Sequence, residues 1–234
     1  MGKGRGEWGS TDRAHNPFLP LSFYFAFTAS KLLFDSLRAT MAASNDEDEW
    51  GEWWDARVAA IETILGPSDE MVGHAPIPFH LGADTGGAAD IIYFKKHLKG
   101  VVSVTSELIG CDEQVQNDLG NYELIICHRD DEPWGANVIS RLAYYTLEAQ
   151  LNPGETMDIA SAVPDDSSIA AFLFCSYGTF KVRGRKGGLL LCVGITADEL
   201  KACRAGKREK VEKALKAAQV YPFTDLYRAS VLTT

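Results

Sequence analysis

The sequence is poor in positive charge, which argues against the classes of protein that depend on it. Its 23 Lys and Arg residues are outnumbered by 32 Asp and Glu residues, giving a formal net charge of -9 and a pI near 5.1. Proteins that bind nucleic acid neutralise phosphates with clustered Lys and Arg side chains. We therefore expect no nucleic-acid partner and predict a basic or neutral partner instead.

Cysteine is present, but in no arrangement typical of a disulfide framework or a zinc site. The five cysteines form an odd number without a CxxC pair. Three of them lie inside or at the end of apolar runs: Cys127, Cys175 and Cys192. Small secreted domains and zinc sites use paired cysteines. The pattern is typical of reduced thiols packed in a core, so we predict a cytoplasmic protein.

The sequence also lacks the motifs of common enzymes: a glycine-rich phosphate loop beside a strand, a DFG triplet and the glycines of a nucleophile elbow. The triplet His128-Arg129-Asp130 resembles the catalytic loop of protein kinases, but Gly135 occupies the position of the metal-binding asparagine. Cys127 and His128 are neighbours on a predicted strand, so their side chains point to opposite faces and cannot form a dyad. None of these patterns predicts catalysis.

One enzymatic alternative stays open, a hydrolase that uses His128 with Asp130 or Asp131. It requires these groups to converge within hydrogen-bond reach in a pocket. A metal site also requires convergent ligands, and three further histidines lie in unrelated loops, namely His74, His80 and His97. We therefore expect neither a metal nor another cofactor.

No hydrophobic run is long enough to span a bilayer. The nearest, residues 18–27, follows basic residues as in a signal peptide, but Pro20 interrupts it and no small-x-small cleavage site follows cleanly. We favour the interpretation that Met41 is the start and that residues 1–40 are upstream sequence read through. A membrane or export segment and a disordered or docked extension remain alternatives. For residues 41–234 we expect no membrane contact.

Residues 48–234 carry the signals of one α+β domain, a mixed β-sheet flanked by helices. Hydrophobic residues make up 46% of the chain, enough for a sizeable core. Apolar periodicity predicts helices near residues 48–65, 138–151, 197–205 and 207–219, and strands near 90–94, 100–108, 122–127, 156–159, 169–175 and 188–195. Two pairs of residues have the spacing of a capping box: Ser44 with Glu47, and Thr196 with Glu199. The segment 184–188 predicts a hairpin turn rather than a phosphate cradle.

The stretch from 121 to 151 places a strand, a polar corner and a helix directly after one another. Residues 122–127 have the length and composition of a strand buried on both faces. Five ionisable residues follow, and Pro133 disfavours the helical conformation at Glu132. Asn137 is the predicted N-cap of the helix, whose apolar stripe ends at residues 152–154.

Three blocks in this order resemble the suppressor-of-fused domain family: CHRDDEPWGANVISRLAYYTLEAQLNPGETMDI, GLLLCVGITADELKACRAGK and YPFTDLYRASVL. The resemblance is good over residues 121–233, weaker over 48–120 and absent over 1–40. The chain is similar to the bacterial single-domain members and lacks the second lobe of the eukaryotic regulator, whose two lobes clamp a peptide as an added strand. The resemblance implies a non-enzymatic protein-binding domain, and in bacteria an immunity protein that neutralises a toxin.

The resemblance and the charge pattern together predict a partner-binding face. The family's peptide-binding tyrosine and aspartate fall near Tyr145 and Glu155. We expect carboxylates to meet a basic partner, either a toxin or a regulator, while aromatic side chains supply apolar contact. The predicted contacts are Asp130, Asp131, Glu132, Trp134, Tyr144, Tyr145 and Glu155. In the alternative interpretation, Asp131 and Arg129 hold the loop in place and Trp134 covers the core. If binding does not occur at this face, we expect it at the loop 74–87.

Overall fold

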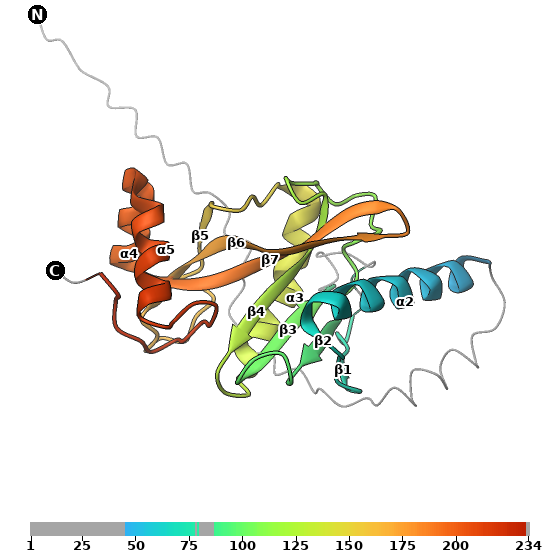
Figure 1. Ribbon diagram of the computed structural model, residues 1–234, viewed down its shortest axis with the longest axis horizontal. Coiled ribbons are helices and arrows are strands. Elements are labelled where there is room, and N and C mark those ends of the chain that lie inside the picture. Colours follow the sequence, from blue (N-terminus) through green and yellow to red (C-terminus); the bar gives the residue numbers. More distant parts are fainter. Residues whose placement is uncertain (1–44, 78, 80–86, 233–234) are drawn as a thin grey trace, which may run out of the picture.

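A mixed β-sheet forms the centre of the molecule (Figure 1). The computed structural model describes residues 45–77, 79 and 87–232. Within these residues the sheet has seven strands in the order β1-β2-β3-β4-β7-β6-β5. The strands are β1 (Val72–Gly73), β2 (Ile91–Phe94), β3 (Val101–Thr105), β4 (Asn121–His128), β5 (Thr156–Asp158), β6 (Ile169–Val182) and β7 (Arg185–Thr196). Among these seven strands β4 and β7 are the parallel pair, with Leu124 opposite Leu190, and the other neighbours are antiparallel.

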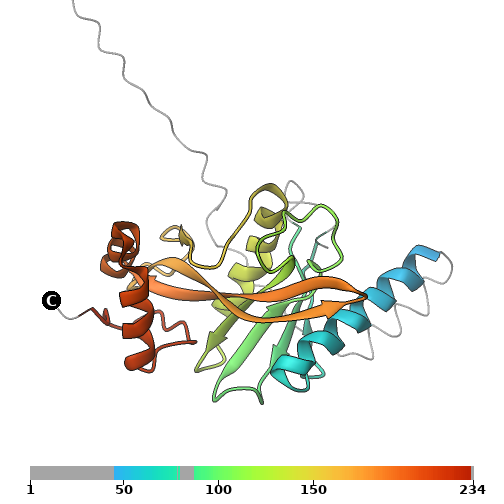
Figure 2. The same cartoon turned by 45° about the horizontal axis from the view of Figure 1, so that its top comes forward.

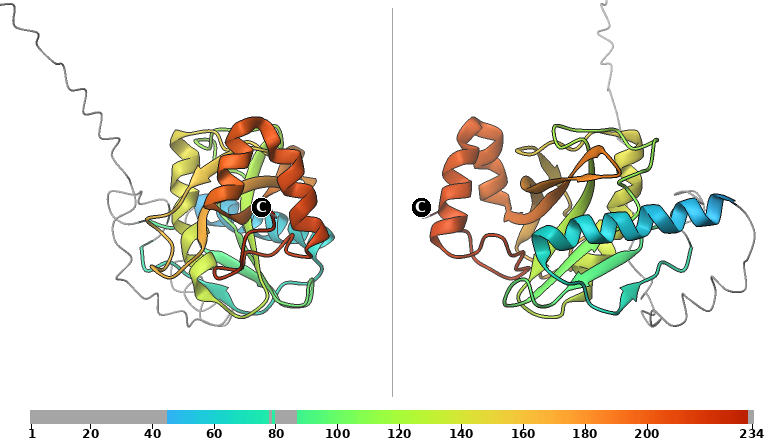
Figure 3. Two further views of the ribbon diagram at one scale, coloured as in Figure 1. Left: turned by 90° about the vertical axis from the view of Figure 1, so that its left-hand side faces the viewer. Right: turned by 45° about the vertical axis from the view of Figure 1, so that its right-hand side comes forward.

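Helices cover both faces of this sheet (Figures 1 and 2). They are α2 (Asn45–Leu65), α3 (Pro133–Glu148), α4 (Ala197–Ala202) and α5 (Arg208–Ala217), with a short π-helical turn, η3 (Cys203–Lys207), between the last two. The buried face of α3 packs in one hydrophobic cluster, whereas α2, α4 and α5 contribute to a second cluster. Figure 3 shows α4 and α5 side by side at one end of the molecule. The expected α+β fold with a flanked mixed sheet is confirmed.

The central strand β4 is buried along its whole length. Tyr122, Leu124 and Ile126 lie in the α3 cluster, and Ile125 and Cys127 lie in the opposite one. This alternation follows from the two-residue period of a strand. The continuous apolar run therefore reflects burial on both faces, as the sequence predicts.

Helix α3 begins five residues earlier than predicted. Asn137 is inside the helix, and the N-cap is Glu132, whose extended backbone precedes Pro133 at the first helical position. The carboxylate of Glu132 accepts a hydrogen bond of 3.2 Å from the backbone N–H of Trp134. The restriction that proline places on the preceding residue thus marks the start of the helix itself. The helix also ends before residues 152–154, because Ala149 is already extended.

The C-terminal half matches the sequence pattern more closely. The predicted hairpin turn lies at Arg183 and Gly184, both with positive φ, while Gly187 and Gly188 belong to β7. The carboxylate of Glu199 accepts from the backbone N–H of Thr196 at 2.9 Å, which confirms the second capping box. The first capping box and residues 1–40 lie outside the described residues.

Two further observations concern the chemistry of the chain. The thiols of all five cysteines are free. No helix in the described ranges combines the length and the apolar character needed to cross a bilayer.

Candidate functional site

The corner after β4 carries three exposed carboxylates: Asp130, Asp131 and Glu132. Asp131 lies 3.5 Å from the ammonium of Lys95, and Glu132 caps α3. Arg129 does not pair with Asp131 here; it donates to the carbonyl of Gln219 and lies over the ring of Phe223, 4.2 Å from its centre. Asp130 and Asp131 are thus accessible to a partner, whereas Glu132 also has a structural role.

Trp134 belongs to the core and not to the surface. Its side chain is only 7% exposed, and the indole N–H donates to the carbonyl of Ala162 at 2.7 Å. The ring centre lies 6.1 Å from that of Phe172. A buried and fully bonded indole offers no area to a partner. We therefore remove Trp134 from the binding face, in agreement with the alternative in which it caps the core.

The two tyrosines of α3 and the carboxylate of Glu155 lie near the other end of the helix. Tyr144 and Tyr145 are both half-buried against the α3 cluster, and Tyr144 meets Phe79 edge to face with ring centres 6.5 Å apart. Glu155 is exposed and accepts hydrogen bonds from the backbone and side-chain N–H groups of Asn152, at 2.8 and 3.2 Å. The corner at residues 130–132 and the turn at Glu155 are separated by α3, which has 16 residues and is therefore about 24 Å long.

The groups named in the hydrolase alternative do not converge. His128 is 4% exposed, and its Nε2 atom makes no hydrogen bond with any described residue. A Cβ atom on Gly135 would lie 2.0 Å from this Nε2, so the imidazole is covered by α3. Asp130 and Asp131 are exposed outside this packing. The described part of the chain also holds no group of three or more His, Cys, Asp or Glu residues placed for a metal ion.

Burial of His128 predicts a loss of stability in mild acid. The pKa of His128 is lowered from 6.5, mainly by burial, although the carboxylates of Glu132 and Asp225 oppose the shift. Below about pH 6.5 the unfolded state therefore takes up this proton before the folded state does. We expect the free energy of unfolding to fall by up to about 1.4 kcal/mol per pH unit from this group, down to its folded-state pKa.

Denaturant titrations between about pH 7 and about pH 5 measure this effect. The control is His128→Gln, which is neutral throughout and should show a flatter dependence whatever its absolute stability. His74 has the opposite sign, because its hydrogen bond to Asp90 raises its pKa and its contribution is lost as the pH rises. Since His74 is present in both proteins, its effect cancels in the difference. Parallel pH profiles would contradict the assignment.

Strand β5 begins directly after Glu155. Among the described residues, β5 is the last strand of the sheet, and it pairs with residues 171–173 of β6. From 142 to 180 the sequence has no Lys, Arg or His, while five carboxylates in this range are exposed: Glu148, Glu155, Asp158, Asp165 and Asp166. Sequence reasoning missed this signal, although the gap in positive charge is visible in the sequence itself.

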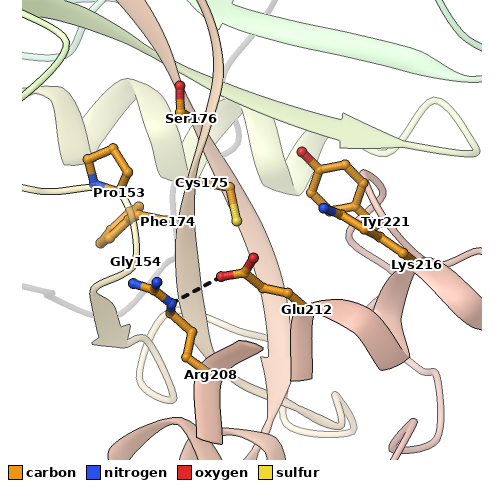
Figure 4. A pocket seen from close by; sticks show the side chains of 9 residues that line it. All are labelled: Pro153, Gly154, Phe174, Cys175, Ser176, Arg208, Glu212, Lys216 and Tyr221. Carbon is orange, nitrogen blue, oxygen red and sulfur yellow. Dashed lines mark ion pairs between the residues drawn. The ribbon is translucent and has the colours of Figure 1, made fainter. Parts of the chain in front are cut away.

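A small cavity of about 240 Å³ adjoins the same turn (Figure 4). It lies between α5 and β6, next to Pro153 and Gly154. Its charged groups are Arg208, Glu212 and Lys216. Arg208 and Glu212 form an ion pair of 3.2 Å, and the ammonium of Lys216 lies over the ring of Tyr221, 5.0 Å from its centre. The thiol of Cys175 points into it (Figure 4), but burial raises the pKa of this thiol to about 12. The thiol is therefore unreactive, and Glu212 neutralises one of the two cations in the lining.

The mixed sheet with helices on both faces defines the class of a single-domain α+β fold. The family model described as "Suppressor of fused protein (SUFU)" matches residues 89–229, more than half of the chain. The protein belongs to the suppressor-of-fused family. The expected family is thereby confirmed.

Solved structures show the same fold. A suppressor-of-fused homologue from Neisseria gonorrhoeae is 17% identical, with a TM-score of 0.57 over 78% of this chain and 98% of that one. The chain matched in the Sufu–Fu complex is 14% identical in sequence, with a TM-score of 0.60; the match covers 76% of this chain and 91% of that one. Drosophila Suppressor of Fused is 15% identical in sequence, with a TM-score of 0.54; the match covers 75% of this chain and 51% of that one. No curated protein matches the chain.

Proposed function

We propose that this protein is a non-enzymatic binding domain that takes a basic protein segment along the edge of β5. The observation that carries the proposal is the open edge of β5 within a stretch that has five exposed carboxylates and no basic residue. An extended segment can add to such an edge through backbone hydrogen bonds, and alternate side chains then supply specificity. Opposite charge would speed the encounter.

The partner-binding face then includes Glu155 and Asp158 beside β5, with Tyr145 on the adjoining helix. Tyr145 and Met157 both pack at the margin of the α3 cluster, so their side chains lie on the same face of the sheet. At the far end of α3, Asp130 and Asp131 extend the negative surface. An extended segment of about seven residues would span the length of α3.

The proposed partner is a cationic protein, and we propose a toxin that this protein neutralises as an immunity protein. The net charge of -9 favours a basic partner. Within the family, the Sufu–Fu structure is a complex with another protein, which supports a protein ligand. The reading frames beside this gene offer a direct check, because an adjacent toxin gene would supply the partner for a binding assay.

Charge reversal at the edge of β5 should weaken partner binding by at least about tenfold. The test variant combines Glu155→Lys with Asp158→Lys. Its matched control combines Asp55→Lys with Glu70→Lys, two exposed carboxylates on α2 and before β1. The control makes the same change in net charge, so it separates local contact from the overall field.

The measurement is the affinity of each purified variant for the captured or co-encoded partner, at low and high salt. Binding by the wild type should weaken as salt rises. Each variant should first be shown to melt cooperatively well above the assay temperature, because Glu155→Lys also removes the hydrogen bonds that Glu155 accepts from Asn152. Equal losses in the test and control variants would refute the β5 site, and turnover of a small molecule without any protein partner would refute the function.

A further inference from the structure

A second cavity, of about 520 Å³, lies away from the edge of β5. The N-terminal half of α2 passes the loop after β3 and the end of α3 here, and Figure 3 shows this half of α2 running beyond the sheet. Four aromatic side chains line it, Trp50, Trp53, Phe79 and Tyr144, together with three charged ones, Arg57, Glu107 and Glu113. A volume of this size is typical of small-molecule sites, which combine an apolar wall with a few polar groups.

Arg57 is one of the residues that line this cavity, and one edge of its guanidinium is buried and unpaired among the described residues. The residue is 3% exposed, and its Nη1 donates to the carbonyl of Ile109 at 2.8 Å. Its Nε and Nη2 atoms are buried and make no hydrogen bond with the residues that the structure describes. The N–H groups of Nε and Nη2 point in one direction, which matches the two oxygens of a carboxylate. Left unpaired, such donors are costly in a protein interior.

Two neighbouring carboxyl groups do not satisfy this edge. Glu123 is fully buried and accepts from Thr105, Leu108 and Ile109. Burial, together with the charge of Asp90, raises the pKa of Glu107 to about 8. Glu107 therefore ionises less readily than an exposed carboxyl group, which weakens its repulsion of an incoming anion.

We propose that this cavity binds a small aromatic carboxylate, with its two oxygens on the Nε–H and Nη2–H edge of Arg57 and its ring against Trp50, Trp53 and Tyr144. The aromatic wall disfavours a strongly hydrated anion such as inorganic phosphate. Arg57 supplies a guanidinium from the lining itself, while Arg183 and Arg185 lie over the ring of Trp53, 5.0 and 5.2 Å from its centre. Aromatic rings pack favourably against one another in offset or edge-to-face arrangements. This site is independent of the protein-binding edge of β5.

Three probes with one indole ring and different charge test the proposal on the full chain. They are indole-3-acetate, the neutral indole-3-acetamide and the cationic tryptamine, each titrated by calorimetry. We expect the carboxylate to bind at least about tenfold more tightly than the amide, and tryptamine to bind weakest. Equal affinities, tightest binding by tryptamine, or no binding of the carboxylate at millimolar concentration would each overturn the proposal.

Variants then locate the bound carboxylate. Trp50 is 37% exposed, so Trp50→Ala should keep the melting temperature while weakening the carboxylate by about fivefold or more through lost ring contact. Arg57→Lys keeps the charge but removes the paired edge, and should reduce the preference for the carboxylate over the amide to the part that charge alone supplies. If Arg57→Lys does not fold, the probe series and Trp50→Ala decide. Tyr227→Ala, at an exposed C-terminal position, is the control and should change nothing.

Discussion

Replacing Arg228 by methionine is expected to lower the free energy of unfolding by about 3–5 kcal/mol. Arg228 forms a two-pronged ion pair with Glu199, with N···O distances of 2.7 and 2.6 Å. The carboxylate is fully buried and also accepts from the backbone N–H groups of Thr196 and Val231. Burial opposes its charge, but these hydrogen bonds keep the pKa of Glu199 below 4.5. Without the arginine, a charged carboxylate stays in the core with its main partner gone.

The effect should be large because this pair joins distant parts of the chain. Arg228 also donates to the carbonyl of Gly194 near the end of β7, so it holds the C-terminal segment against the start of α4. The matched control is Arg208→Met, which breaks the partly exposed pair with Glu212 and should cost less than about 1 kcal/mol. Equilibrium unfolding in urea, followed by circular dichroism, compares the two. Similar losses in both variants would refute the argument.

Much of the sheet could be predicted because its signals are local. The runs that became β2, β4 and β7 are continuous apolar segments between polar or glycine-containing stretches, and a strand needs little else. The parallel pairing of β4 with β7 could not be predicted. It depends on a crossover through α3 and β5, which brings Asn121 opposite Gly187 across the sheet.

The candidate site could be predicted only in part, because some of its side chains also depend on contacts between distant parts of the chain. The carboxylates of the corner are exposed, as a run of charge suggests, but Trp134 is buried because Ala162, 28 positions away, supplies an acceptor for its indole. The acidic residues beside β5 could have been found from the lack of basic residues between 142 and 180.

The buried charges were missed because each was hidden in a pattern with a simpler interpretation. Arg57 lies in an amphipathic helix, where an arginine normally faces solvent. Glu123 lies in the middle of the apolar run of β4, where one carboxyl among β-forming residues was the available signal. Both side chains hold the segment after β3, which no local pattern indicates.

The second large effect is expected at this carboxyl group: Glu123→Leu should lower the free energy of unfolding by about 3–5 kcal/mol. Glu123 accepts hydrogen bonds from the hydroxyl of Thr105 at 2.7 Å and from the backbone N–H groups of Leu108 and Ile109 at 2.9 and 2.8 Å. Leucine has a similar volume but no acceptor, so it leaves two backbone donors unpaired. It also removes the carboxyl group with the largest electrostatic effect on Arg57. The total free energy of unfolding of a native domain is only about 5–15 kcal/mol.

Two variants separate the loss of hydrogen bonds from a general intolerance of change at this position. Glu123→Gln keeps one carbonyl oxygen for Leu108 and Ile109 and should cost about 1–2 kcal/mol, whereas Glu113→Leu changes an exposed carboxylate of the same loop and should change stability by less than about 0.5 kcal/mol. Denaturant unfolding gives these values, and amide hydrogen exchange shows where they arise. Exchange at Leu108 and Ile109 should accelerate more in Glu123→Leu than the global loss of stability explains, because their acceptor is gone. If Glu123→Leu is as stable as Glu123→Gln, the carboxyl group does not hold this turn, and the position of Arg57 at the cavity must depend on Ile109 alone.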